Sequence, residues 1–153
     1  MFSKDDTSCP IYKAIAKEEL LLPVSYTMRS GGKKSRGELI RHVQAMLGND
    51  DEEANKLTEN IIRDIDILHN ASLVIDDIQD ASKKRRGKEC AHLKYGIPQC
   101  INAGYLAVFG VLDEAMNRYP KDKQTEAFNI FIKHTIRMHV GQGMDIHWAN
   151  KAS

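Results

Sequence analysis

The sequence has few cysteines, almost no net charge and no long apolar run, and each shortage excludes a class of protein. Cys9, Cys90 and Cys100 are odd in number and form no CxxC pair, so we expect free thiols rather than a disulfide framework or a zinc site. A formal net charge of +1 argues against a surface built to cover a nucleic acid. The apolar runs are too short to span a bilayer, and residues 1–10 lack an apolar signal core. We therefore expect a cytoplasmic protein without a transmembrane segment.

What the sequence does contain is helical periodicity. Apolar residues recur at helical spacing along almost the whole chain, and no segment alternates with the period of a strand. We expect helices over about residues 8–22, 38–47, 51–79, 98–119 and 121–148, with Pro23, Gly48 and Pro120 as stops. The helix that is capped by Asn49 or Asp50 is apolar on more than one side, which predicts a central position. The fold class is therefore all-α, with about five helices in one domain.

A group of acidic residues ends this central helix. Asp76 and Asp80 are four residues apart and share one helical face, and His69 lies seven residues before Asp76 on the same stripe. Aspartates crowded at the negative end of a helix dipole repel one another. A divalent cation would relieve the repulsion, and Mg²⁺ takes a few carboxylates together with phosphate oxygens and water. For the DDxxD pattern alone, a solvated acidic turn is the better interpretation, because surface helices often end in charged residues.

Two basic segments accompany the aspartates. One runs from Lys83 to Lys88 directly after them, and the other contains Lys33 and Arg36 beside two glycines. By itself the first segment is typical of a nuclear-localisation or nucleic-acid patch. Beside a metal site, arginines suit bidentate contacts to diphosphate oxygens, and glycines let the backbone approach a phosphate. The combination favours a diphosphate site.

Together these segments resemble the trans-isoprenyl diphosphate synthases, and among them the geranylgeranyl diphosphate synthases most closely. The matching segments are the GGKxxR loop at 31–36, the first aspartate-rich helix at 68–80, the arginine pair at 85–87 and the GQxxD helix at 141–146. Gly37 stands where many members have proline. The resemblance implies an isoprenoid synthase-type helical bundle and a prenyltransferase with Mg²⁺ as its cofactor. Small side chains before the first aspartate, Ala71 and Ser72, leave the pocket open for geranylgeranyl rather than farnesyl diphosphate.

The resemblance also implies a role for each matching residue. The isopentenyl diphosphate would be held by Lys33, Arg36, His69 and Arg86. Arg85 would hold the allylic diphosphate, and Asp76 and Asp80 would bind Mg²⁺. Asp77 would orient its neighbours, and Gln142 and Asp145 would border the pocket. The expected catalytic residues are therefore Asp76, Asp80 and Arg85.

One part of the family pattern does not occur in the sequence. The second aspartate-rich motif is absent from residues 1–153. We therefore expect a single partial polyprenyl synthase domain, truncated to the N-terminal half, with little activity alone. Its partner would be a second copy or a full-length synthase. The alternatives are a non-catalytic regulatory paralogue of the synthase, a class I terpene cyclase, and a nucleic-acid binder that uses Lys83–Lys88. A cyclase would have no need for Lys33, Arg36 and His69.

Overall fold

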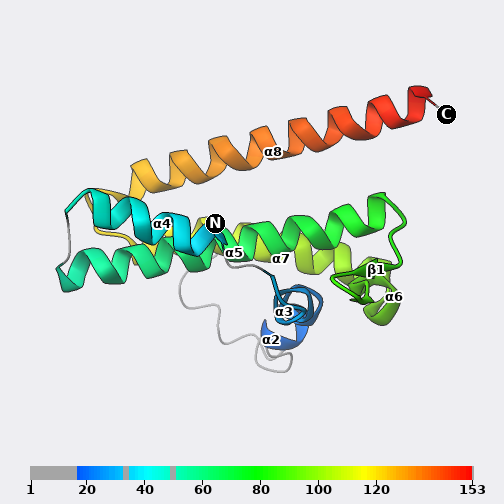
Figure 1. The fold of residues 1–153 in the computed structure, drawn as a ribbon, viewed down its shortest axis with the longest axis horizontal. Helices are drawn as coiled ribbons and strands as arrows, with labels where there is room; N and C mark the ends of the chain where they lie inside the picture. Colours follow the sequence, from blue (N-terminus) through cyan, green and yellow to red (C-terminus); the bar gives the residue numbers. More distant parts are fainter. Residues whose placement is uncertain (1–16, 33–34, 49–50, 153) are drawn as a thin grey trace, which may run out of the picture.

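The computed structural model describes residues 17–32, 35–48 and 51–152, which are almost entirely helical (Figure 1). The helices are α2 (Lys17–Leu20), α3 (Leu22–Arg29), α4 (Ser35–Met46), α5 (Glu52–Gln79), α6 (Ala91–Tyr95), α7 (Ile97–Arg118) and α8 (Gln124–Ala152). In the described residues the only strands are β1 (Lys84–Arg85) and β2 (Lys88–Glu89). The all-α prediction is confirmed. Most of the first expected helix lies outside the described residues.

The long helix α5 is central, as its periodicity predicts. It runs unbroken for 28 residues, a length of about 42 Å. Its N-cap is Asp51, whose side chain accepts a hydrogen bond from the Ala54 amide at 2.7 Å. The expected caps, Asn49 and Asp50, lie outside the described residues. Because α5 contacts α3, α4, α6 and α7, it organises the rest of the chain.

One local prediction was wrong, and one element was not predicted. Pro23 does not end a helix but lies in the first turn of α3, where a missing backbone N–H leaves no hydrogen bond unmade. The basic connection after α5 contains an antiparallel hairpin, in which Arg85 pairs with Lys88. Its two turn residues, Arg86 and Gly87, have φ values of 53° and 79°. Positive φ at both positions is the geometry of a tight type I′ turn, whose twist suits a hairpin.

The core lies between α3, α5 and α7 and is built mainly from small side chains. Its buried members are Val24, Ala71, Val74, Ala91, Cys100, Ala103 and Ala107. Small residues let α5 and α7 approach closely. At Gly104, for example, an added Cβ would lie 2.9 Å from Cδ1 of Ile75, which is shorter than van der Waals contact. This close approach fixes α7 beside the last turns of α5.

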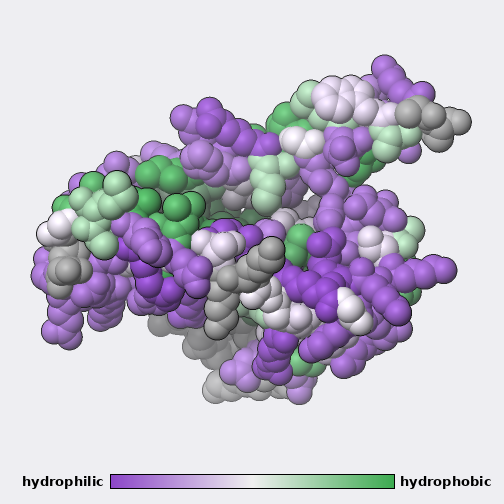
Figure 2. All heavy atoms as spheres, viewed as in Figure 1, coloured by the Kyte–Doolittle hydropathy of each residue, from purple (hydrophilic) through white to green (hydrophobic). Residues whose placement is uncertain are grey.

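The last helix, α8, packs on α7 and extends along the molecule (Figure 1). It continues through Gly141 and Gly143, around which the described residues leave open space. Large apolar side chains remain exposed, mainly on α4, α7 and α8, and Figure 2 shows apolar surface over α4 and on α8. They include Leu39, Val43, Met46, Leu47, Tyr105, Phe109, Ile136, Val140 and Trp148. None of the described helices is long and apolar enough to cross a membrane.

Candidate active site

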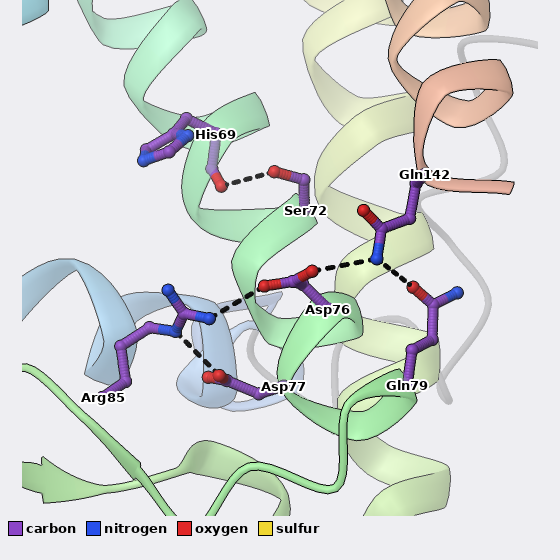
Figure 3. A network of polar contacts seen from close by, with 7 residues as sticks. All are labelled: His69, Ser72, Asp76, Asp77, Gln79, Arg85 and Gln142. Atoms are coloured by element: carbon purple, nitrogen blue, oxygen red, sulfur yellow. Dashed lines mark hydrogen bonds and ion pairs between the residues drawn. The ribbon is translucent and has the colours of Figure 1, made fainter. Parts of the chain in front are cut away.

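The end of α5 and its C-cap bring Asp76, Asp77 and Asp80 together. Arg85 folds back from β1 onto the first two, as Figure 3 shows. Its Nη2 lies 2.8 Å from Oδ2 of Asp76, and its Nε lies 2.7 Å from Oδ1 of Asp77. Burial opposes the charge of Arg85, but the hydrogen bond and the proximity of Asp77 raise the pKa of its guanidinium. Arg85 is therefore a fixed cation at the edge of an acidic group.

Asp77 is the enclosed member of this group. Its side chain is 2% exposed, and its backbone carbonyl accepts a hydrogen bond from the Ser82 amide at 2.9 Å. Burial, followed by the nearby Asp77 carboxylate, raises the pKa of the Cys90 thiol to about 11. Asp77 is thus almost excluded from solvent, which leaves Asp76 and Asp80 as the carboxylates that a ligand can reach.

Asp80 is the open and electrostatically crowded member. Desolvation, and then the carboxylates of Asp76 and Asp145, raise the pKa of Asp80. Like charges without a counter-ion produce such a shift. Across the part of the chain that the structure describes, no three His, Cys, Asp or Glu side chains are grouped to hold a metal. Two carboxylates that solvent can reach, Asp76 in part and Asp80 more fully, fit Mg²⁺ better than a metal held by protein alone, because Mg²⁺ keeps water and takes oxygens from a diphosphate.

Gln142 reaches the same aspartates from α8. Its Nε2 donates to Oδ1 of Asp76 at 2.9 Å and to Oε1 of Gln79 at 3.1 Å. In Figure 3, Gln142 and Arg85 approach Asp76 from opposite sides. Both carboxylate oxygens of Asp76 therefore have protein partners, one from each side of α5.

A basic cluster lies on the Arg85 side of α5. Arg86 donates from Nη1 to the Gly31 carbonyl, and an added Cβ at Gly32 would lie 3.2 Å from the Arg86 Cζ. Burial, then the charges of Arg36 and Arg86, lower the pKa of His69, so its imidazole is neutral at physiological pH. The structure thus places Arg36, His69 and Arg86 within electrostatic range of one another. Lys33 lies outside the described residues.

Sequence reasoning missed one partner of this cluster. Asp66 lies 3.7 Å from Arg36, measured from Oδ1 to Nε. The sequence could have indicated Asp66 as a neighbour of the cluster, because it is three residues before His69 and therefore on the same side of the helix. Asp66 leaves the cluster less positive than its three basic residues suggest.

A cavity of about 370 Å³ opens beside the acidic group, between α5, α7 and α8. Asp76, Gln79 and Gln142 line it beside the acidic group, and the rest of its walls are mainly apolar. They include Ala71, Ser72, Ile75, Gly104, Tyr105, Val108, Met138 and His139. A second cavity of about 250 Å³ shares His69 and Met138 with it and continues between α5 and α8. No motif marks Met138 or His139, because only the fold brings α8 to this place.

Comparisons with known proteins agree on one family. Polyprenyl synthetases match residues 17–153. A geranylgeranyl pyrophosphate synthase of Dictyostelium discoideum is 42% identical over 146 residues, which cover 95% of this chain and 45% of that protein. The synthase dpmpD of Macrophomina phaseolina is 38% identical over 95% of this chain and 42% of its own length. The solved geranylgeranyl pyrophosphate synthetase of the archaeon Geoglobus acetivorans superposes with a TM-score of 0.73 at 27% identity, over 86% of this chain and 45% of that one. The chain thus spans less than half the length of these relatives.

Proposed function

The chain belongs to the polyprenyl synthetase family, and from that premise we propose that it carries the first diphosphate-binding wall of a geranylgeranyl diphosphate synthase. The reaction would join isopentenyl diphosphate to an allylic diphosphate. One observation carries the proposal: Asp76 and His69 of one helix line an apolar cavity, and Asp80 and the two arginines of the basic cluster lie near them. The names of the relatives support the same product.

Each charged group has a task in this proposal. The isopentenyl diphosphate would bind to Arg36, His69 and Arg86, together with Lys33. A neutral His69 can donate one hydrogen bond to this diphosphate, and it adds no positive charge beside the two arginines. Asp66 would be displaced from Arg36 by the stronger anion, since their separation of 3.7 Å makes a weak pair.

The acidic side would bind the allylic diphosphate. Asp76 and Asp80 would hold Mg²⁺, which supplies positive charge for the departing pyrophosphate. Asp76 would exchange its contacts with Arg85 and Gln142 for ligand contacts, which frees the Arg85 Nη2 for a diphosphate oxygen. Asp77 would hold the Arg85 side chain in this orientation through the 2.7 Å hydrogen bond that it accepts from the Arg85 Nε. After the allylic C–O bond breaks, the double bond of isopentenyl diphosphate would attack the carbocation, and the new cation would lose a proton to the released pyrophosphate to form the product double bond. The apolar walls would keep water away from both cations.

The cavity walls support a long product. Ala71 and Ser72 lie on its wall, one turn from Asp76, and both are small. Tyr105 is the bulky residue on the opposite wall, whereas Phe109 is not among the lining residues. We therefore propose geranylgeranyl diphosphate as the product. Ser72→Phe in a complete enzyme should shorten it to farnesyl diphosphate, measured by chromatography of the hydrolysed products. An unchanged product would contradict this role of the wall.

We propose little synthase activity for the 153 residues by themselves. The described charged groups would contact a leaving diphosphate from one side only. Each electrostatic stabiliser that is missing typically lowers the rate by a factor of about 10²–10³. The exposed apolar faces of α4, α7 and α8 would suit a second copy or a full-length synthase in the cytoplasm. A non-catalytic regulatory partner is the second candidate function. Co-purification with a full-length synthase, with turnover of that synthase changed but no turnover by the chain alone, would favour it.

The proposed function is tested by calorimetric titration with farnesyl diphosphate. The chain should bind this ligand in the presence of Mg²⁺, and the double variant Asp76→Ala/Asp80→Ala should bind at least about a hundredfold more weakly. Asp113→Ala, which removes an exposed carboxylate from α7, is the matched control and should bind normally. Equal Mg²⁺-dependent affinity in the double variant and the control would overturn the assignment.

A further inference from the structure

The hairpin that carries Arg85 and Arg86 is too small to hold its own shape. Each strand has two residues, and a lone hairpin of that size is not stable in water. Arg86 also adopts a φ of 53°, which a side chain other than glycine or asparagine rarely takes. The position of both arginines therefore depends on contacts between the hairpin and the helices.

The side-chain contacts of the two arginines use groups that the proposed function assigns to ligands. Arg85 is bound to Asp76 and Asp77, and Arg86 donates to the Gly31 carbonyl. A diphosphate that binds these arginines would compete with the contacts to Asp76 and Gly31, whereas the bond from Arg85 to Asp77 would be kept. An anchor that involves neither guanidinium would hold the hairpin whether or not a ligand is bound.

Tyr26 of α3 provides such an anchor. Its hydroxyl donates to the backbone carbonyl of Glu89, in the return strand of the hairpin, at 3.0 Å. The Tyr26 ring is itself held on α6: its centroid is 5.7 Å from that of Tyr95, edge to face, and the Lys94 Nζ lies 4.6 Å above it. Aromatic and cation–π contacts of this kind fix the direction of the hydroxyl. The hydroxyl then fixes Glu89, which pairs with Lys84, the residue before Arg85.

We propose that Tyr26 is a positioning residue, which sets the diphosphate affinity of Arg85 and Arg86 by anchoring their hairpin to α3. The affinity part of this inference rests on the proposed function. The anchoring part does not, because it concerns only the order of the hairpin.

The test compares Tyr26→Phe with Tyr95→Phe. Both variants lose one hydroxyl from the same aromatic cluster, but only the first loses the bond to Glu89. In the presence of EDTA, inorganic pyrophosphate should bind about threefold to tenfold more weakly to Tyr26→Phe, the cost of one hydrogen bond. Tyr95→Phe should bind like the natural chain. Amide hydrogen exchange of residues 84–90 should quicken in Tyr26→Phe alone, with α5 unchanged.

A double variant separates positioning from general stability. In an Arg86→Asn background, where the asparagine suits the turn but carries no charge, Tyr26→Phe should add less loss of affinity than in the natural chain. An equal added loss in both backgrounds, or equal hairpin exchange in the two phenylalanine variants, would overturn the inference. If the natural chain does not bind pyrophosphate, the proposed basic site fails, and the exchange comparison still decides whether Tyr26 anchors the hairpin.

Discussion

The helix α5 carries two aspartate–arginine groups that are built in opposite ways. In its middle, Asp64 is fully buried and both of its oxygens are satisfied. Arg118 Nη1 lies 2.7 Å from one oxygen, and the Tyr119 hydroxyl donates to the other at 3.0 Å. At its end, Asp80 is exposed and crowded by Asp76 and Asp145. One group is closed to ligands and the other is open.

The difference shows which charges serve the fold and which serve a ligand. Burial, together with Asp64, raises the pKa of Tyr119 above its usual range, so the phenol stays a neutral donor. Arg118 also bonds to Glu114, so the central group is saturated by its own members. The terminal aspartates have one partly buried cation, Arg85, for three carboxylates. A buried charge without partners lowers stability. An excess of negative charge that faces solvent, as at the end of α5, remains available to bind a cation.

Removing Asp64 should give the largest loss of unfolding free energy, because it breaks the central group. Asp64→Ala leaves the Tyr119 hydroxyl without its acceptor and leaves Arg118 with Glu114 alone. Loss of one partner from a buried pair typically costs about 3–5 kcal/mol of unfolding free energy. Denaturant unfolding followed by circular dichroism measures it, with Asp113→Ala as the exposed control. A loss no larger than that of the control would mean that the buried pair does not hold the helices together.

Replacing Arg86 should separate binding from stability at the open end. Arg86→Asn removes a cation but supplies a residue that tolerates positive φ. Affinity for pyrophosphate should fall by about 1.5–3 kcal/mol, the range of a hydrogen bond to a charged group. The unfolding free energy should stay equal or rise slightly. A fall in stability with unchanged affinity would assign Arg86 to the fold instead.

Replacing Asp80 should give the smallest change in unfolding free energy. The change should be a gain, whereas the change expected for Asp64→Ala is a loss. Because Asp76 and Asp80 are like charges four residues apart, Asp80→Asn should raise stability by about 0.2–0.5 kcal/mol near pH 7. The folded-state pKa of Asp80 is raised, so the natural chain binds protons more readily when folded and gains stability as pH falls through that pKa. The advantage of the variant should therefore shrink toward about pH 4. Thermal unfolding at both pH values would show it, and a variant less stable than the natural chain near neutral pH would contradict the repulsion.

The sequence could predict what local spacing determines. The length of α5, its central place and the two charged segments follow from periodicity and from residues close together in the chain. The hairpin did not follow, because strands of two residues offer no alternation and Arg86-Gly87 is not the usual Asn-Gly turn. The Asp64 group joins residues 54 apart, and Gln142 meets Asp76 across 66 residues. Contacts at that range depend on how α7 and α8 pack, which no local pattern determines.

The most direct test of the open acidic site is the magnesium dependence of pyrophosphate binding. Calorimetric titration of the chain should give one bound pyrophosphate per chain in EDTA, at the basic cluster of Arg36, His69 and Arg86. In saturating Mg²⁺ it should give a second, which Asp80→Asn weakens and Asp113→Ala does not. The same stoichiometry and affinity in EDTA and in Mg²⁺ would contradict the account, since the crowded aspartates of α5 would then have no ligand to accept.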